Sequence, residues 1–591
     1  MSDTTHATQG RSGVTTGIVM LAVLAAMIVT VWTVSPDVDW SGRPRIDIGT
    51  ISLVLLFGML ILLAIGMPLG FASGFLAVVV MVLKFEPTIL SDPFVHGFNF
   101  EAYTWGNGTL TRRFGAGPMN ILAQRLYGIT TNYVLISVPL FIFMAVLLER
   151  SGIARDMYSS LSQWMNRTRG GIAVVTAIMA IVMAAMSGII GGEVVLLGLI
   201  ALPQMLRLGY DQNLAIGTIC ASGSLGTMIP PSIVLIFYGL ITETSIHALF
   251  QAAFLPGFML AGCYIIYILV RTRMNPSLAP LPEPGPDDLT GEQKKLFGGT
   301  LLAILAVVFG ALVLLRFTMV QSGLVKVEEN TWFQGMDTLY IWGPIFAAGL
   351  LWCLRAGRAT VSESWARGKG MVQPLLIVLV VLGSIYGGIT GITEAAAMGS
   401  IAVLLLIILR GEFSFTLLRE ASMRTFKSTG TIIWVTFGAT ALAGAYTISG
   451  GPTYVANLIV GYDLPTMGVL LVMMVIFLFL GAFMDWTGIV LLVMPVFLPI
   501  VLKLPMDELG LTGGLDTRTM VQVWFGILFC VNMQVSFLSP PFGPAAFYLK
   551  SVAPPHITLP DIFRGFLPFI CMQLFILAII LLVPEITTVF L

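Results

Sequence analysis

The chain has 591 residues, of which 57% are hydrophobic and 10% are charged. Soluble domains carry roughly 25% charged residues, so this composition excludes a soluble enzyme and indicates a chain that lies mostly in a bilayer. Lysine plus arginine and aspartate plus glutamate balance at 30 each. Because no basic stripe with interleaved aromatic residues occurs, nucleic acid is not expected as a partner.

The cysteines, the histidines and the lack of a nucleotide-binding motif exclude further kinds of site. The five cysteines are isolated in apolar stretches without CxxC spacing, and the four histidines are scattered in tails and loops. We therefore expect neither a disulfide framework nor a histidine-ligated metal. The sequence also lacks a GxxxxGK[ST] motif, which excludes ATP hydrolysis by the P-loop route.

Apolar segments recur along the chain without the alternation of barrel strands, so we predict an all-α polytopic membrane protein. The first segment, 14–34, is interpreted as a retained span rather than a cleaved signal peptide. Ten further segments follow, at 51–67, 70–83, 133–148, 250–270, 296–315, 339–354, 374–389, 395–409, 429–448 and 566–582. The polar, glycine-rich stretch 85–132 is expected to lie along the outer interface, to dock on another subunit, or to form an ordinary loop.

Arginine and lysine concentrate in four connecting segments, which are 150–169, 271–295, 355–369 and 410–427. Cytoplasmic loops keep an excess of these residues. We therefore place all four segments and the N-terminus in the cytoplasm, and the loop 321–337 outside. The hydrophilic string PEPGPDD, which ends at residue 288, separates two halves of the chain.

The two halves repeat one pattern of a Gly- or Asp-containing break, an apolar run, a proline, a polar turn and a helix interrupted by Pro-Pro. The first half reads MSGIIGGEVVLLGLIALPQMLRLGYD and then ASGSLGTMIPPSIVLIFYG; the second reads FMDWTGIVLLVMPVFLPIVLK and then MQVSFLSPPFGPAAFYLK. Pro230-Pro231 and Pro540-Pro541 must break their helices, which at membrane depth requires a polar cavity or neighbours that satisfy the backbone. Paired breaks indicate a secondary transporter, and prolines of structural use alone are the alternative.

Four strings carry a resemblance to a known family. GTICASGSLGTMIPPSIVLIFYG, SIHALFQAAFLPGF, GGITGITEAAAMGSIAVL and NMQVSFLSPPFGPAAFYL resemble the large membrane subunit of TRAP (tripartite ATP-independent periplasmic) transporters. The match runs from about residue 55 to the C-terminus and is similar to the longer subclass labelled for mannitol or chloroaromatic compounds. The first span and the pair of spans at 296–354 resemble additions to shorter members.

The resemblance implies an elevator-type transporter of the inner membrane with inverted repeats, two re-entrant hairpins and two Pro-Pro-broken helices. It implies import of a small organic acid driven by a sodium gradient, with no cofactor besides the coupling ion. The implied partners are a periplasmic substrate-binding protein, a small four-span membrane subunit and the lipid bilayer.

Site residues are carried over onto both halves. The first hairpin would be 187–205, and the second would lie within 449–464 or 485–502. The candidates around the first break are Ser187, Gly188, Glu193, Ser222, Gly223, Ser224, Gly226, Thr227, Pro230 and Pro231. The candidates around the second are Asn532, Ser536, Ser539, Pro540 and Pro541. Many shorter members have G-S-S where Gly188-Ile189-Ile190 stands here, so backbone carbonyls or Glu193 would hold the cation.

Three carboxylates inside apolar segments are functional candidates because charge is costly in a bilayer. Glu193, in the first hairpin, would ligate sodium or carry a proton, or serve as a helix cap. Thr393-Glu394 would contribute to a site or cap the following helix. Asp485 stands where a helix is expected to break in the second half. Its spacing does not decide between a functional and a structural role.

Hydroxyl and carbonyl oxygens at the breaks suit sodium, which prefers hard oxygen ligands. No arginine or lysine lies inside either mid-membrane motif. We therefore expect helix N-termini and hydroxyls to bind the substrate carboxylate. The alternative is that these hydroxyls only pair helices in lipid.

The predicted organisation follows from these assignments. In chain order it comprises an N-terminal tail, extra span and outer loop (1–49), scaffold spans with an interfacial segment (50–170), a first transport repeat (171–270), a linker with an extra helical pair (271–373), scaffold spans of the second half (374–448), and a second transport repeat with the final span (449–591). Two other functions stay open, namely a stand-alone organic-anion symporter or antiporter, and an intramembrane transferase using Asp485 or Glu193.

Overall fold

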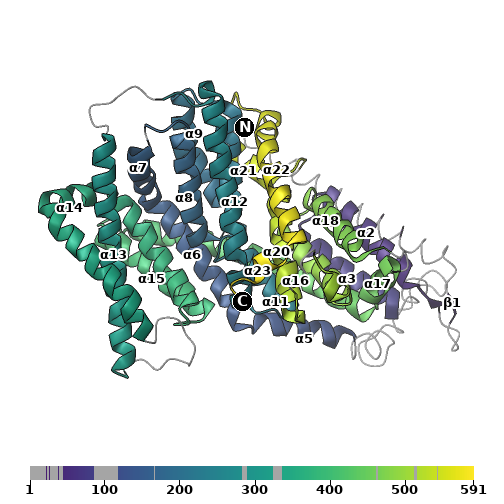
Figure 1. The fold of residues 1–591 in the computed structure, drawn as a ribbon. Helices are drawn as coiled ribbons and strands as arrows, with labels where there is room; N and C mark the ends of the chain where they lie inside the picture. Colours follow the sequence, from purple (N-terminus) through teal and green to yellow (C-terminus); the bar gives the residue numbers. More distant parts are fainter. Residues whose placement is uncertain are drawn as a thin grey trace. The chain divides into compact units, whose positions relative to one another are not determined.

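The structure is a computed structural model of the chain. It describes residues 22, 26, 37–38, 44–85, 118–165, 167–188, 190–281, 289–323, 336–460, 464–510, 515–541 and 543–591. Within these residues the regular structure is helical apart from one two-residue antiparallel pair, β1 (Asp37–Val38) and β2 (Pro44–Arg45) (Figure 1). The predicted all-α class is confirmed. The string PEPGPDD lies outside the described residues, as do the predicted span 14–34 apart from residues 22 and 26 and most of 85–132 and 321–337.

The described chain contains eight helices, or pieces of helix, that are long and apolar enough to cross a bilayer. They are Tyr133–Arg150, Ile246–Met274, Gly291–Gln321, Thr338–Tyr386, Ile392–Leu409, Phe415–Ile448, Arg518–Leu538 and Leu559–Leu582. Shorter apolar helices accompany them. Since helices satisfy all of their backbone groups internally, this content fits the predicted polytopic membrane protein.

The chain divides into two compact units, each of which is assembled from several stretches of sequence. The first unit comprises Met1–Asn132, Gly430–Met473 and Met484–Glu508, and the second comprises Tyr133–Thr429, Met474–Phe483 and Leu509–Leu591. α16 (Phe415–Ile448) and α18 (Thr466–Gly481) each contribute residues to both units.

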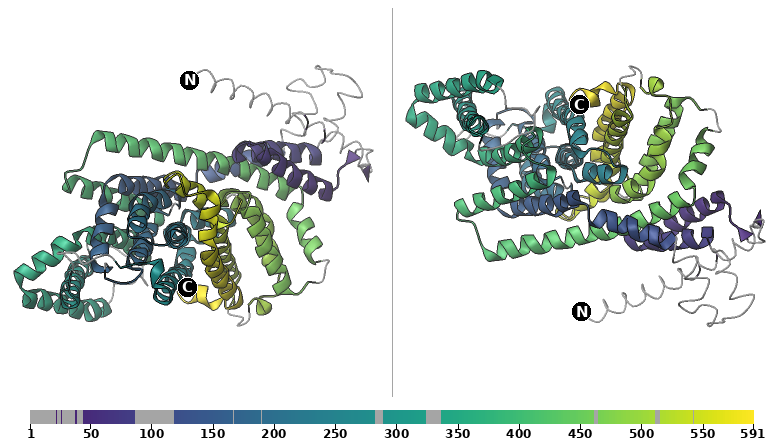
Figure 2. Two further views of the ribbon diagram at one scale, coloured as in Figure 1. Left: turned by 90° about the horizontal axis from the view of Figure 1, so that it is seen from above. Right: turned by 90° about the horizontal axis from the view of Figure 1, so that it is seen from below.

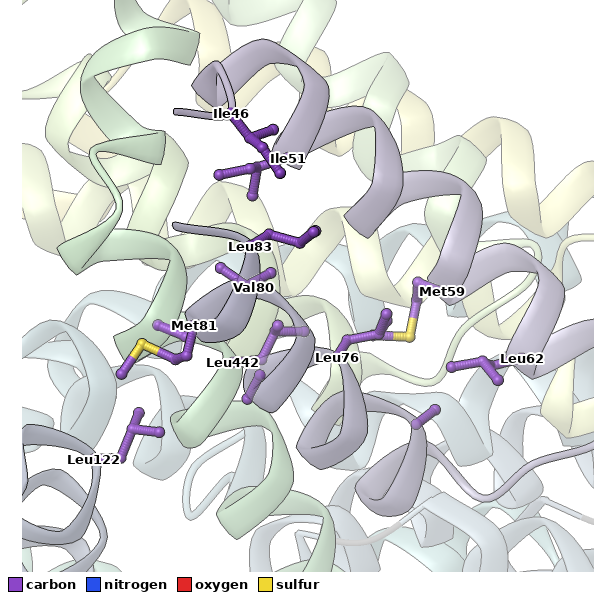
Figure 3. Packing of buried hydrophobic residues seen from close by; sticks show 13 residues of the cluster. Ile46, Ile51, Met59, Leu62, Leu76, Val80, Met81, Leu83, Leu122 and Leu442 are labelled. Carbon is purple, nitrogen blue, oxygen red and sulfur yellow. The ribbon is translucent and has the colours of Figure 1, made fainter. Parts of the chain in front are cut away.

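The first unit is built around one apolar cluster. Its helices include α2 (Ile48–Ala64), α3 (Leu69–Phe85), α5 (Pro118–Thr130), α17 (Gly451–Val460) and α19 (Trp486–Val501). Ile51, Leu76, Val80 and Leu442 are fully buried in the cluster (Figure 3). Asp47 begins α2 by accepting a 2.7 Å hydrogen bond from the Gly49 amide, which satisfies one of the free donors at a helix start.

The second unit holds the remaining α-helices of the described chain. They are α6 (Ser137–Arg150), α7 (Ile153–Met165), α8 (Gly171–Ser187), α9 (Ile190–Arg207), α10 (Gln212–Ser224), α11 (Ile233–Thr242), α12 (Ile246–Met274), α13 (Gly291–Gln321), α14 (Met336–Tyr386), α15 (Ile392–Leu409), α20 (Arg518–Leu538), α21 (Pro544–Lys550), α22 (Leu559–Leu582) and α23 (Glu585–Thr588). α13 and α14 run side by side in both views of Figure 2.

Three predicted connecting segments are mostly helical. Residues 355–369 fall within the range of α14, but Gly357 (φ 80°, ψ 157°) is not helical, so two helices meet at a kink there. Arginine, alanine and glutamate favour helix, and Arg367 pairs with Glu363 at 3.0 Å across one turn. Likewise α7 occupies most of 150–169, and α16 begins at Phe415 inside 410–427.

Basic residues in these segments pair with carboxylates on neighbouring helices of the second unit. Arg410 follows the end of α15 and contacts Asp156 of α7 at 2.5 Å and Glu412 at 2.7 Å. The hydrogen bond to Glu412 is the largest influence on the guanidinium and raises the pKa of Arg410. The arginine therefore links α7 to the end of α15.

The repeated sequence pattern corresponds to a repeated order of helices along the chain. In the first half α8, α9 and α10 are followed by the Pro230-Pro231 break, then α11 and α12. In the second half α18, α19 and α20 are followed by the Pro540-Pro541 break, then α21 and α22. Both proline pairs interrupt helices, as predicted. This order favours 485–502, rather than 449–464, as the counterpart of α9.

Candidate functional site

The first predicted hairpin begins with a tight turn between α8 and α9. α8 ends at Gly188, which has φ 61° and donates its amide to the Ala184 carbonyl. A Cβ at this position would lie 2.4 Å from the Pro231 carbonyl oxygen. Only glycine fits the backbone and the space. The predicted hairpin 187–205 therefore covers the turn and α9, whereas α8 supplies the arm before it.

Glu193 lies in the first turn of α9 and is 2% exposed. The Ser187 hydroxyl donates to its Oε1, and within the described residues its Oε2 has no hydrogen-bond partner. A Cβ on Gly226 would lie 3.2 Å from both carboxylate oxygens. The carboxylate thus faces the glycine of the 3-10 turn η4 (Leu225–Thr227), which follows α10.

A cavity of about 70 Å³ adjoins this carboxylate. Ser187, Gly192 and Glu193 line one part of it, and Glu149 of α6 and Arg424 of α16 line another. Glu149 and Arg424 form an ion pair at 2.8 Å. The cavity exceeds the volume that a single ordered water needs, about 10–15 Å³, so a cation with a ligating water fits beside Glu193.

A buried amide joins the two broken helices. Gln534 of α20 is fully buried, and its side-chain oxygen lies 2.6 Å from the Ser224 hydroxyl. Its nitrogen donates to the Ser224 carbonyl at 2.8 Å and to the Thr227 hydroxyl at 2.6 Å. Ser224 and Thr227 are thereby bound to protein, so the structure uses these predicted ion ligands to hold α10 against α20.

Three buried polar atoms near the broken helices have no hydrogen-bond partner within the described chain. They are the hydroxyls of Thr218 and Ser222 on α10 and the side-chain oxygen of Asn532 on α20. The Asn532 nitrogen donates to the Met474 carbonyl at 3.0 Å. Buried polar groups are almost always paired, so these oxygens are candidates for contact with an ion, water or substrate.

The remaining candidates around the first break have packing roles. A Cβ on Gly223 would meet Val194 Cγ2 at 2.7 Å, so this glycine allows α9 to approach α10. Pro230 and Pro231 are buried, and Ser232 begins α11 and donates to the Thr227 carbonyl at 2.5 Å. The break is therefore fixed by side chains on both sides.

The second break is arranged differently. Ser536 and Ser539 donate to carbonyls four residues back in their own helix, at 3.2 and 2.8 Å. Pro540 and Pro541 are both exposed. A hydroxyl bonded to the i−4 carbonyl is already satisfied as a donor, so these serines offer weaker candidates than Glu193.

Neither Glu394 nor Asp485 lines the cavity beside Glu193. Glu394 is exposed in the first turn of α15 and accepts from the Tyr133 hydroxyl at 3.0 Å, while Thr393 donates to the Tyr133 carbonyl at 3.4 Å. Asp485 belongs to the first unit, precedes α19 and accepts from Thr487 at 2.8 Å. Each carboxylate thus lies at the start of a helix, where the helix dipole favours a negative charge.

Sequence reasoning missed Gln534 and the Glu149–Arg424 pair. Gln534 carries a weak signal, because it is an amide between Asn532 and Ser536 in an otherwise apolar helix. Glu149 and Arg424 looked like ordinary residues of basic loops, and only the packing of α6 and α16 against α9 brings them to the cavity.

These features define a class, a polytopic helical membrane protein with paired helix breaks of the kind that secondary transporters use. Residues 56–586 match the family model described as "Tripartite ATP-independent periplasmic transporter, DctM component". The chain belongs to this family. It is therefore a multi-pass permease of the inner membrane rather than an intramembrane transferase, and the family name implies a periplasmic binding protein and a small membrane subunit as partners.

Curated relatives are similar over most of the chain. The C4-dicarboxylate TRAP transporter large permease protein DctM of Pseudomonas aeruginosa is 24% identical over 80% of this chain and 90% of its own length. The ectoine TRAP transporter large permease protein TeaC of Halomonas elongata is 26% identical over 80% and 89%. The isethionate TRAP transporter permease protein DctMQ of Oleidesulfovibrio alaskensis is 24% identical over 80% and 61%.

Among solved structures, the crystal structure of the YdaH transporter of Alcanivorax borkumensis matches with a TM-score of 0.45. The identity is 14%, and the match covers 78% of this chain and 87% of that chain.

Proposed function

We propose that this permease imports a small organic acid, received from a periplasmic binding protein, in symport with sodium. The observation that carries the coupling is Glu193, a buried carboxylate with one oxygen unpaired within the described residues. An isolated buried charge is costly, so the group requires a cation or a proton. Its contacts with Ser187 and Gly226 and the adjoining cavity supply oxygen ligands and room.

Sodium suits this arrangement because it prefers hard oxygen ligands. Ser187 and Glu193 both line the cavity, and Arg424 in the cavity wall is paired with Glu149. A cation at Glu193 would neutralise the carboxylate between α9 and η4. It would thereby favour a nearby anionic substrate, which is a reciprocal linkage between two sites.

The substrate class rests on the relatives and on the helix ends. The relatives are named for C4-dicarboxylate, ectoine and isethionate, all small charged organic molecules. No lysine or arginine lies within 222–240 or 532–549, the stretches around the two Pro-Pro pairs. We expect the amide groups at the start of α11 and the Ser222 hydroxyl, which has no partner within the described residues, to donate to the substrate carboxylate.

The orientation and the mechanism belong to the same proposal. The N-terminus lies in the cytoplasm, as the arginine and lysine distribution indicates. The binding protein docks on the periplasmic face, and a four-span subunit accompanies the chain. Movement is of the elevator type, with the α8–α12 repeat and its counterpart carrying the ion and substrate.

The test is uptake into proteoliposomes that contain this chain and its small membrane partner. We expect uptake of labelled C4-dicarboxylates only with both an inward sodium gradient and the binding protein. Matched potassium controls for ionic strength. Uptake that needs sodium but not the binding protein would favour a stand-alone symporter, and uptake that persists without either would refute the proposal.

A further inference from the structure

The cavity beside Glu193 is lined by three charged side chains. Within the described chain they are Glu193 of α9, Glu149 of α6 and Arg424 of α16. Arg424 Nη1 lies 2.8 Å from Glu149 Oε1, so these two charges offset one another. The lining residues therefore carry a net charge of −1 when both carboxylates are ionised, which one sodium ion would balance.

The three groups lie at different depths. Glu193 is 2% exposed, and its Oε2 has no hydrogen-bond partner within the described residues. The Glu149 and Arg424 side chains are 19% and 40% exposed. A Cβ on Gly192 would lie 3.3 Å from Glu149 Oε2, so the second carboxylate reaches the first turn of α9. The ion pair with Arg424 thus neutralises a carboxylate that would otherwise be a second anionic ligand in the same cavity.

The net charge of a site discriminates between cations of different charge. Coulomb energy follows the product of the charges, so a nearby positive group costs a divalent ion twice as much as a monovalent ion at the same distance. Without Arg424, the lining would carry a charge of −2. The two carboxylates and the hydroxyls of Ser187 and Ser428 would then supply six oxygen atoms, which is the lower limit of the six to eight that calcium takes.

We propose that Arg424 selects a monovalent cation in this cavity, because it neutralises Glu149. This inference rests on the proposed sodium site at Glu193. It gives the ion pair a role beyond joining α6 to α16. Arg150 and Glu420 form a second ion pair between the same two helices, at 2.5 Å, and neither residue lines the cavity. That pair provides a matched control.

Calcium binding is measured by equilibrium dialysis of the purified full chain in detergent, with labelled calcium in sodium-free buffer. Arg424→Gln should bind one calcium ion at least about tenfold more tightly than the wild type, because a positive charge is removed. Arg150→Gln, which breaks the control pair, and Arg424→Lys, which keeps the charge, should retain the wild-type affinity. Unchanged affinity in Arg424→Gln, or an equal gain in Arg150→Gln, would overturn the proposal.

Two further variants separate the charge from the contact between helices. Glu149→Gln combined with Arg424→Gln returns the lining charge to −1 with the ion pair still broken, so the calcium affinity should return to the wild-type value. Glu149→Gln alone leaves a net charge of zero, so sodium should protect the purified protein against heat only at concentrations at least about tenfold higher. Tight calcium binding in the double variant, or unchanged sodium protection in the single one, would contradict the role of Arg424.

Uptake distinguishes a failure of this inference from a failure of the proposed function. In proteoliposomes with calcium on both sides of the membrane, sodium-driven uptake should be inhibited in Arg424→Gln and not in the wild type. A wild type without sodium dependence would refute the proposed function. A sodium-coupled wild type, with an Arg424→Gln variant that is insensitive to calcium, would refute only the role of Arg424.

Discussion

The two Pro-Pro breaks look alike in sequence and differ in their surroundings. At the first, the prolines are buried, the carboxylate of Glu193 faces the η4 turn, and Gln534 binds Ser224 and Thr227. At the second, Pro541 is exposed, and Ser536 and Ser539 bond to their own helix.

The difference shows that two helix breaks with the same sequence pattern can have different side-chain surroundings. A Pro-Pro pair dictates only that the helix stops. The side chains that other helices bring to the free backbone decide whether the break becomes an ion site or a packing joint. On this comparison we propose the coupling cation at the first break, whereas the second contributes Gln534 and Asn532 to buried polar contacts.

The largest expected effect is on coupling at the first break. Glu193→Gln keeps the shape but removes the charge, so sodium-driven uptake should fall by about 100-fold, at the upper end of typical coupling factors. Uptake as a function of sodium concentration in proteoliposomes measures the loss. Glu292→Gln, an exposed carboxylate at the start of α13, is the matched control. Unchanged sodium dependence in Glu193→Gln would remove the assigned site.

The hairpin turn should be the next most sensitive position. Gly188→Ala places a Cβ 2.4 Å from the Pro231 oxygen in a left-handed conformation, which should cost about 2 kcal/mol or more. The thermal midpoint in detergent and the uptake rate should both fall. Gly262→Ala on α12, where nothing lies within 4 Å of the added Cβ, should be neutral or slightly stabilising. Equal behaviour of the two variants would contradict the tight turn.

Removing the side-chain amide of Gln534 should lower the stability of the protein, because this group joins α20 to α10 and η4. Gln534→Leu leaves buried partners on Ser224 and Thr227 unsatisfied, at about 1–3 kcal/mol. Denaturation in detergent measures the loss. In a double-mutant cycle, Thr227→Val should cost less in the Gln534→Leu background than in the wild type. Additive effects of the two substitutions would show that the contact is absent.

The smallest effect is expected at the second break. Ser536→Ala removes a hydroxyl that bonds only to the Asn532 carbonyl of its own helix, so the stability should change by less than about 1 kcal/mol. Sodium-dependent uptake should remain within twofold of wild type. A loss comparable to that of Glu193→Gln would make the two breaks chemically equivalent and erase the comparison.

The sequence predicted the helical class and the positions of both breaks, and it singled out Glu193, which the structure shows to be buried. Long apolar segments, paired prolines and a lone carboxylate are local signals, and each has a direct physical consequence in a bilayer. Basic charge in 355–369 marked a connection that is shorter than the segment. The chain leaves the helical conformation only at Gly357, and the basic residues that follow belong to the next helix.

The sequence by itself determined where helices must end and which charged side chains are costly to bury in lipid. Only the tertiary structure decided which groups meet. Gln534 lies far along the chain from Ser224, and Glu149 of α6 and Arg424 of α16 reach one cavity. Such contacts depend on how helices pack, and packing is set jointly by side-chain shapes that no single segment encodes.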